Sequence, residues 1–330
     1  MAIGVVLVLR ALGLGDLLSG VPALRGVRRA YPDHRIVLAT PPELAPLALA
    51  SGAVDEVLPA RGLAPLTAPE HVADPDVAVN LHGRGPESHR LLRAVRPGRL
   101  VAFRSADAGH AEGPDWLAGE YEVARWCRLL RAHGIPADPG DLALPPPPTP
   151  CPGRVVVHPG AAHPRRRWPA GRFAAVARAL TDAGEEVVIT GSAAEAPLAY
   201  GLASAAGLAP GAVLAGRTDA GELAGIVAGA RLVICGDTGV AHLATAFGTP
   251  SVVLFGPVSP AEWGPPPGRE AHMALWRPAA GGEGAATTPV DAGHVDRALA
   301  AIGVGEVLAA ARRLLGGPAQ PVASSMPTVR

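Results

Sequence analysis

Short aliphatic runs recur along the chain and alternate with stretches in which apolar residues fall at helical spacing. Runs that are apolar on both faces are typical of parallel strands covered by helices on each side. Such runs stand at residues 5–9 (VVLVL), 35–39 (RIVLA), 76–81 (DVAVNL), 154–158 (RVVVH), 186–190 (EVVIT), 231–235 (RLVIC) and 251–255 (SVVLF). Between them, the apolar residues within 173–180 and 240–247 lie on single helix faces. This alternation predicts an α/β fold.

A proline-rich segment divides the pattern into two halves. Residues 145–152 read PPPPTPCP, and four consecutive prolines suit neither a helix nor a central strand but favour a stiff spacer. At 330 residues the chain is also long for a single core. One more amphipathic helix, at 304–315, closes the pattern. The predicted units are an N-terminal Rossmann-like domain at 1–144, a linker at 145–150, a C-terminal Rossmann-like domain at 151–315 and a disordered tail at 316–330.

The composition narrows the class of protein. With 48% hydrophobic and 18% charged residues and a net charge of zero, the chain predicts a soluble globular protein that does not bind nucleic acid. It contains no lysine, so any cationic role falls to arginine or histidine. The three cysteines form no CxxC pair, which fits a reducing cytoplasm. The apolar run from Ile3 to Leu9 is too short to span a bilayer.

A glycine-containing turn follows the first predicted strand, and Asp16 comes directly after it. Gly13 and Gly15 begin like a dinucleotide-binding turn, but Leu18 occupies the place of the third glycine and the second strand ends without an acidic residue. Both features argue against an NAD-dependent dehydrogenase. We expect the glycines to let the backbone turn sharply, so that Asp16 reaches a ligand. The alternative is that Asp16 caps a helix beginning at Leu17.

A second strand-to-helix turn, within residues 232–257, has the composition of an anion site. The chain turns at Asp237, and a helix is predicted to begin near Thr238. At about 100° per residue, Thr238, His242 and Thr245 fall on the face opposite the apolar residues. Helix-start amides, a hydroxyl and an imidazole suit a nucleotide diphosphate. The alternatives are that Asp237 is only an N-cap and His242 only a surface histidine.

Two further loops follow predicted strands, where open α/β sheets bind ligands. Arg165–Arg167 precede a Trp-Pro pair, and a guanidinium can bind a diphosphate through two parallel hydrogen bonds. At least one of these arginines is expected to be merely solvated. In the N-terminal half, His82, Arg84 and His89 follow a strand and are candidates for contacts to a second substrate. Ordinary loop polarity is the alternative for each.

Three segments together resemble glycosyltransferase family 9, the ADP-heptose:lipopolysaccharide heptosyltransferases. They are GLGDLLSGVPALRGVRRAYP, VVVHPGAAHPRRRWPAGRFA and GDTGVAHLATAFGTPSVVLFGPVSPAEWGP, in family order over nearly the whole chain. The resemblance implies a GT-B fold, in which two Rossmann-like domains face each other across a cleft, with the acceptor on the first domain and the nucleotide sugar on the second. It also implies that the helix at 304–315 packs back toward the N-terminal domain.

The resemblance assigns roles to residues that match the family pattern. Asp16 corresponds to the general base, held by the turn of Gly13 and Gly15. These two glycines join His82 and Arg84, which are candidates from their place after a predicted strand, on the acceptor side. The donor-binding residues that it implies are Arg166, Asp237, Thr238, Gly239 and His242. Arg166 stands where the family usually has a lysine, so a planar guanidinium replaces a point charge.

The implied activity is metal-independent, inverting transfer of a heptose from ADP-heptose to a hydroxyl of a glycan, glycolipid or metabolite, without a cofactor. The expected setting is the biosynthesis of lipopolysaccharide or another envelope glycan, by a cytoplasmic monomer with peripheral membrane contact. Two alternatives remain open. A non-catalytic sugar-nucleotide binding module would keep the site around Asp237 without needing Asp16. A metal-dependent glycosyltransferase would use Asp74 and Asp76 as metal ligands, although proline and acidic residues are common immediately before a strand.

Overall fold

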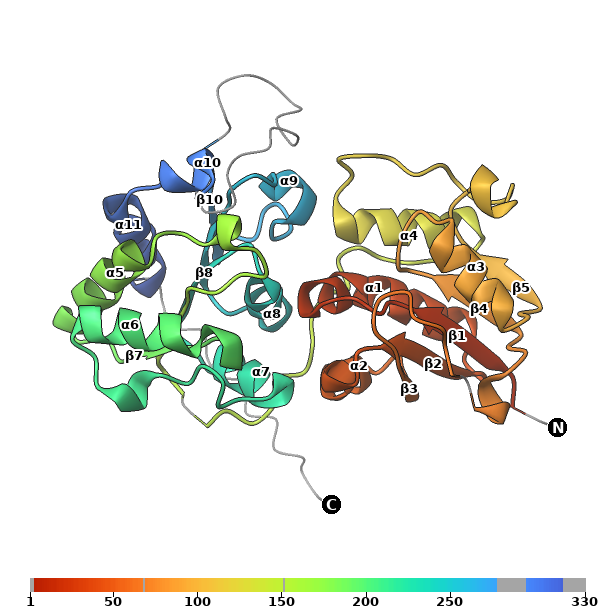
Figure 1. The fold of residues 1–330 in the computed structure, drawn as a ribbon, viewed down its shortest axis with the longest axis horizontal. Helices are drawn as coiled ribbons and strands as arrows, with labels where there is room; N and C mark the ends of the chain where they lie inside the picture. The colour runs from red at the N-terminus through yellow and green to blue at the C-terminus, as the bar shows by residue number, and fades with distance from the viewer. Residues whose placement is uncertain (1–2, 68, 151, 278–294, 317–330) are drawn as a thin grey trace, which may run out of the picture.

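The computed structural model describes residues 3–67, 69–150, 152–277 and 295–316, and these form two parallel five-stranded sheets (Figure 1). The first has the order β3-β2-β1-β4-β5 and the second β10-β9-β8-β6-β7. The strands are β1 (Val5–Leu9), β2 (Arg35–Thr40), β3 (Glu56–Pro59), β4 (Val77–Asn80), β5 (Arg99–Val101), β6 (Val155–His158), β7 (Val187–Ile189), β8 (Leu232–Gly236), β9 (Ser251–Leu254) and β10 (His272–Leu275). The predicted α/β class is confirmed.

Helices cover both sheets, as all-parallel sheets require. In the N-terminal half they are α1 (Leu14–Ala30), α2 (Ala45–Ala50), α3 (Glu87–Ala94) and α4 (Glu122–Ala132). In the C-terminal half they are α5 (Ala170–Asp182), α6 (Ala196–Ala206), α7 (Ala220–Ala228), α8 (Gly239–Phe247), α9 (Pro260–Trp263), α10 (Arg297–Ala300) and α11 (Val304–Leu315). No helix of the described residues combines the length and apolar character needed to cross a membrane.

The last helix corrects one expectation. Helix α11 packs against α5, β8 and β9, within the C-terminal half, and not toward the N-terminal domain. The reason is its apolar stripe: Val307, Ala310 and Ala311 are buried in the same hydrophobic cluster as Phe173 of α5. The predicted tail, apart from Gly316, lies outside the described residues.

The proline-rich segment is less of a free spacer than its sequence predicts. Residues 145–150 form no helix or strand, but they lie against the C-terminal half. A Cβ atom on Gly225 of α7 would lie 2.4 Å from the Pro148 carbonyl oxygen, and one on Gly229 would lie 2.1 Å from Thr149 Oγ1. These glycines let the segment approach α7 closely, so it connects the halves along a fixed path.

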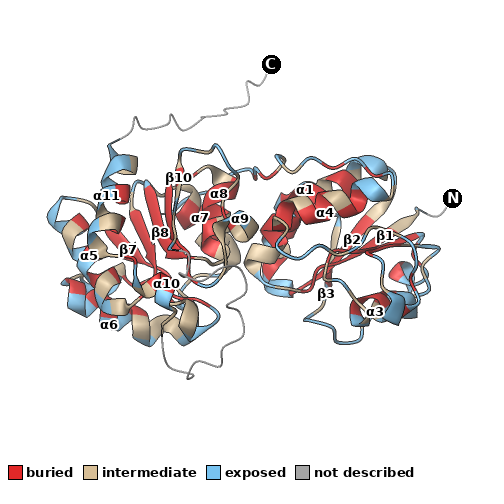
Figure 2. Cartoon of the chain, turned by 90° about the horizontal axis from the view of Figure 1, so that it is seen from above, coloured by how far each residue is buried: buried red, intermediate tan, exposed pale blue. Residues whose placement is uncertain are grey.

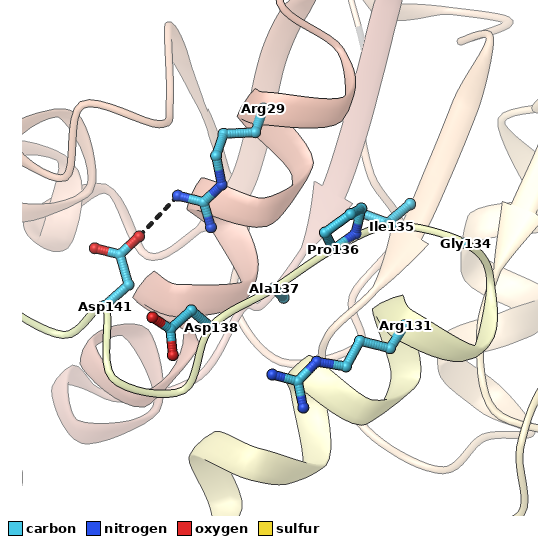
Figure 3. A pocket seen from close by; sticks show the side chains of 8 residues that line it. All are labelled: Arg29, Arg131, Gly134, Ile135, Pro136, Ala137, Asp138 and Asp141. Carbon is cyan, nitrogen blue, oxygen red and sulfur yellow. Dashed lines mark hydrogen bonds and ion pairs between the residues drawn. The ribbon is translucent and has the colours of Figure 1, made fainter.

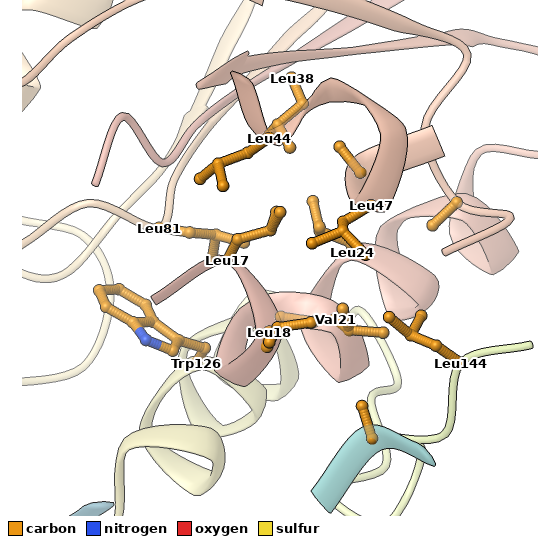
Figure 4. Packing of buried hydrophobic residues seen from close by; sticks show 14 of the residues in the cluster. Leu17, Leu18, Val21, Leu24, Leu38, Leu44, Leu47, Leu81, Trp126 and Leu144 are labelled. Atoms are coloured by element: carbon orange, nitrogen blue, oxygen red, sulfur yellow. The ribbon is translucent and has the colours of Figure 1, made fainter. Parts of the chain in front are cut away.

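The hydrophobic core continues from one half into the other. Helix α1 packs against α4 on its own sheet and against α8 of the other half, and α2 contacts α7 (Figures 1 and 2). One buried cluster includes Leu17, Leu18 and Trp126 from the first half and Val240 and Leu243 from the second. Figure 4 shows the α1 side of this cluster. Helices α1 and α8 therefore bring the starts of two helices, one from each half, into contact.

Candidate active site

Helix α1 begins earlier than predicted and uses Asp16 differently. Its N-cap is Gly13, and the helix starts at Leu14 rather than Leu17. Asp16 is thus not the N-cap but the third helical residue, and its Oδ2 accepts a hydrogen bond of 3.1 Å from the Gly13 N–H. The other oxygen, Oδ1, lies 4.0 Å from Arg10 Nη2. The Asp16 side chain is 28% exposed, so a substrate can reach a carboxylate whose orientation is already held.

Gly15 allows helix α8 to approach closely; it does not form a sharp turn. Neither Gly13 nor Gly15 has a positive φ, which corrects the predicted reason for these glycines. A Cβ atom on Gly15 would lie 2.9 Å from His242 Cδ2, and one on Gly239 would lie 2.7 Å from Leu14 Cβ. The starts of α1 and α8 therefore touch through two glycines. This contact brings the predicted base and the predicted donor turn together.

The turn predicted to bind the donor, residues 237–239 (here called the donor turn), follows β8, and Thr238 rather than Asp237 is the N-cap of α8. The Thr238 side chain makes no capping hydrogen bond, and its Oγ1 is buried without a partner among the described residues. Asp237 Oδ2 instead lies 3.6 Å from Arg166 Nη1. Burial raises the pKa of the Asp237 carboxyl, and the Arg166 charge opposes that rise. A free hydroxyl and unpaired helix-start amides suit an anionic ligand.

His242 lies one turn further along α8, between the two halves. Burial lowers its pKa to about 4, Glu122 of the N-terminal half acts to raise it, and Arg10 acts to lower it further. The imidazole is therefore neutral at pH 7 and can donate one hydrogen bond. Its ring meets Trp263 edge to face, with centroids 6.0 Å apart. Thr245, expected on the same outward face, is buried and donates to the Ala241 carbonyl oxygen, so that part of the prediction is wrong.

Two arginines of the basic loop, Arg166 and Arg167, have different surroundings. Arg166 faces Asp237 at the donor turn. Arg167 donates from Nε and Nη2 to the Ala161 carbonyl oxygen, at 3.1 and 3.0 Å, and lies 3.7 Å from Glu195. Arg167 is therefore engaged by its own loop, whereas the Arg166 guanidinium lies beside Asp237.

The acceptor-side candidates separate into three cases. The charges of Arg10 and Asp16 act on His82. Burial lowers the pKa of the His82 imidazole, the Arg10 charge lowers it further, and the Asp16 charge acts to raise it. Its Nδ1 is buried and has no hydrogen-bond partner among the described residues. Arg84 is exposed. His89 is fully buried and bonds to the Phe103 carbonyl oxygen at 2.8 Å, so its side chain is held in the interior of the fold.

Sequence reasoning missed two charged residues beneath the site. Arg10 follows β1 and is completely buried, and Glu122 at the start of α4 is only 4% exposed. Arg10 Nη2 donates to Glu122 Oε1 at 3.3 Å. A charged residue directly after the apolar run 5–9 was the one available signal for Arg10, because such a position lies at the buried carboxyl edge of a central strand. No pattern in the sequence around Glu122 indicated that this residue would lie near the candidate site.

The residues suggested for metal binding have structural partners. Asp74 forms a two-bond ion pair with Arg96, at 2.7 and 2.9 Å. Asp76 Oδ2 accepts a 2.8 Å hydrogen bond from the Val5 N–H. The part of the chain that the structure describes contains no cluster of three or more His, Cys, Asp or Glu side chains able to hold a metal ion. The carboxylates at 74 and 76 are thus explained as strand-entry anchors.

An open pocket of about 740 Å³ lies away from this site (Figure 3). Its lining includes Arg29 near the end of α1, and Arg131 and Asp138 beside α4. Arg29 is paired with Asp141 at 2.8 Å. Along α1, at 1.5 Å per residue, Arg29 is roughly 20 Å from Asp16. The pocket therefore takes no part in the chemistry at the helix starts.

The fold, with two facing Rossmann-like halves, is that of GT-B glycosyltransferases. A family 9 glycosyl transferase from Veillonella parvula superposes with a TM-score of 0.74 at 20% identity, over 96% of this chain and 98% of that one. The Escherichia coli ADP-heptose LPS heptosyltransferase II gives a TM-score of 0.73 at 20% identity, over 94% and 98%. At this identity the likenesses establish the fold.

Sequence comparison points to the same class of protein. Residues 150–280 match the model of glycosyltransferase family 9 (heptosyltransferase), and the predicted resemblance to that family is confirmed over these residues. Lipopolysaccharide heptosyltransferase 2 of E. coli K12 is 33% identical over 119 residues, which are 35% of this chain and 34% of that protein. The chain thus spans about a third of the length of the curated relatives it matches.

Proposed function

We propose that this protein is a metal-independent, inverting glycosyltransferase that transfers a heptose from ADP-heptose to a hydroxyl of a glycan, glycolipid or metabolite. The observation that carries the proposal is the contact between the two helix starts. Gly15, next to Asp16, meets His242 and Gly239 of the donor turn. A binding module would need only the donor turn, whereas a transferase needs a base beside it.

The donor diphosphate is assigned to the start of α8. Helix-start amides and the unpartnered Thr238 hydroxyl can donate to its oxygens. Arg166, now 3.6 Å from Asp237, supplies the cation, and neutral His242 supplies a further donor. These groups stabilise the negative charge that builds on the leaving diphosphate as the glycosidic bond breaks. The names of the relatives, lipopolysaccharide and ADP-heptose heptosyltransferases, support the choice of donor and an envelope glycolipid as acceptor.

Asp16 is assigned the role of general base. Its Oδ2 is held by the Gly13 N–H, which leaves Oδ1 to accept the proton of the acceptor hydroxyl. The acceptor oxygen attacks the anomeric carbon as the diphosphate leaves from the opposite face, which inverts the configuration. A positioned carboxylate contributes about 10²–10⁴-fold to such a step. His82, whose imidazole lies in the electrostatic field of Arg10 and Asp16, is the alternative base.

Asp16→Asn tests the proposal, because asparagine keeps the size and the contact with Gly13 but is far too weak a base. Turnover with ADP-heptose should fall by about 10²-fold or more, while ADP-heptose affinity by calorimetry stays within about twofold. Near-normal turnover would move the base to His82, to be checked with His82→Gln. Donor binding without transfer to any acceptor offered would favour the non-catalytic module.

A further inference from the structure

Arg10 is the most deeply buried charge near the candidate site. Burying a charge costs free energy unless hydrogen bonds and an opposite charge compensate it, so its partners indicate what it holds. Nε donates to the Asp16 carbonyl oxygen and Nη1 to the Leu81 carbonyl oxygen. Nη2 donates to Ser19 Oγ at 3.0 Å and to Glu122 Oε1 at 3.3 Å.

These partners come from three separate elements. Asp16 and Ser19 belong to the first turns of α1, Leu81 directly follows β4, and Glu122 opens α4. Ser19 Oγ also donates back to the Asp16 carbonyl oxygen at 3.0 Å. One planar guanidinium therefore joins the turn that carries the base to the sheet edge and to the neighbouring helix.

The surroundings are shaped for a guanidinium. A Cβ atom on Gly20 would lie 2.8 Å from Arg10 Cδ, so the glycine makes room for the side chain. The Trp126 ring lies beneath the charge, with its centroid 4.7 Å from Cζ. Glu122 does not depend on Arg10 alone, because it also pairs with Arg125 and accepts from Trp126 Nε1. Compensation of the Glu122 charge therefore does not by itself explain why the Arg10 guanidinium contacts Asp16 and Ser19 of α1.

We propose that Arg10 is the positioning residue for the Asp16 carboxylate, and this rests on the proposed role of Asp16 as base. By holding the Asp16 carbonyl, Arg10 fixes the first turn of α1. Its charge lies 4.0 Å from Asp16 Oδ1, and this attraction restrains the orientation of the carboxylate. A misplacement of about 1 Å at a reacting group can cost about 10²-fold in rate.

The test combines Arg10→Met with Asp16→Asn. Arg10→Met should lower kcat by about 10–100-fold with KM for ADP-heptose within about threefold, and should add no further loss in the Asp16→Asn background. Hydrogen exchange of the amides of residues 13–17, followed by mass spectrometry, should become faster. Multiplicative losses in the double variant, or unchanged exchange, would overturn the proposal.

Two controls separate positioning from stability. Arg125→Met removes the other arginine partner of Glu122 but no contact to α1, so it should lower the melting temperature without changing exchange at 13–17. The pair Arg10→Met with Glu122→Gln removes both charges, and should regain melting temperature but not kcat. Recovery of kcat together with melting temperature would mean that Arg10 only balances Glu122.

The exchange measurement does not depend on activity. If the parent protein transfers no sugar from ADP-heptose or another nucleotide sugar, the proposed function fails. Faster exchange at residues 13–17 in Arg10→Met but not in Arg125→Met would then still support Arg10 as the anchor of this turn, and equal exchange would refute it.

Discussion

Gly15 and His242 are in direct contact across the two halves, at a distance that leaves no room for a side chain on residue 15. A Cβ atom there would lie 2.9 Å from Cδ2 and 3.3 Å from Nε2 of the imidazole. Because the next residue is Asp16 and His242 belongs to α8, this contact sets the distance between the proposed base and the proposed donor site.

Gly15→Ala should therefore disturb the contact between α1 and α8. Overpacking a tight contact typically costs about 1–3 kcal/mol, so the unfolding midpoint in urea should fall, and turnover should fall by about tenfold or more as the helix starts separate. Gly13→Ala is the matched control for stability, since its Cβ would meet only Asp16 Oδ2, at 3.5 Å. Equal stability of the two variants would show that the His242 side chain can move away from residue 15 at little cost in free energy.

Arg166→Ala should weaken ADP-heptose binding by up to a few kcal/mol, at about 1.5–3 kcal/mol for each charge-assisted bond lost. The physical reason is the loss of the cation facing Asp237 at the donor turn. Isothermal calorimetry provides the measurement, and Arg165→Ala in the same loop is the control. Unchanged affinity in Arg166→Ala together with a loss in Arg165→Ala would transfer the role to Arg165.

Thr238→Val should separate ligand binding from stability. The Thr238 hydroxyl is buried and without a partner in the described residues, and an unsatisfied buried hydroxyl costs about 1–3 kcal/mol. Replacing it with a methyl group should leave the melting temperature equal or higher, while affinity for ADP-heptose falls. A lower melting temperature with unchanged affinity would show that the hydroxyl serves the fold instead.

We expect the free energy of unfolding to fall in mild acid because of His272. It is 8% exposed at the start of β10, and burial, helped by Arg269, lowers its pKa to about 4. An unfolded imidazole has a pKa of about 6.5, so the unfolded chain binds more protons between these values. Stability from this group is complete above about pH 6.5 and is lost as the pH falls toward 4.

Between pH 7 and pH 5 the share of His272 in that loss is on the order of 2 kcal/mol. Urea unfolding of the parent and of His272→Asn at both pH values measures it: the variant should be less stable at pH 7 but lose less on acidification. The same pH dependence in both proteins would mean that His272 takes up its proton in the folded state.

The class of fold, and the segments that make up the candidate site, could be predicted from local sequence patterns. Strand runs such as 5–9 and 231–235 were readable because burial on both faces leaves a local apolar pattern. The donor turn was readable because a strand end, Asp237 and a helix start follow one another in the chain. Asp16 was predicted from the glycines beside it and from the family resemblance.

How these segments contact one another could not be predicted in this way. Gly15 is required by an imidazole far away in the sequence, Thr245 is buried by neighbours outside its own helix, and α11 packs on its own sheet rather than crossing over. The buried pair of Arg10 and Glu122 likewise joins a strand end to a helix start that a long stretch of chain separates. The physical reason is that periodicity records which face of an element is buried, whereas close approach and ion pairing depend on which distant element covers that face.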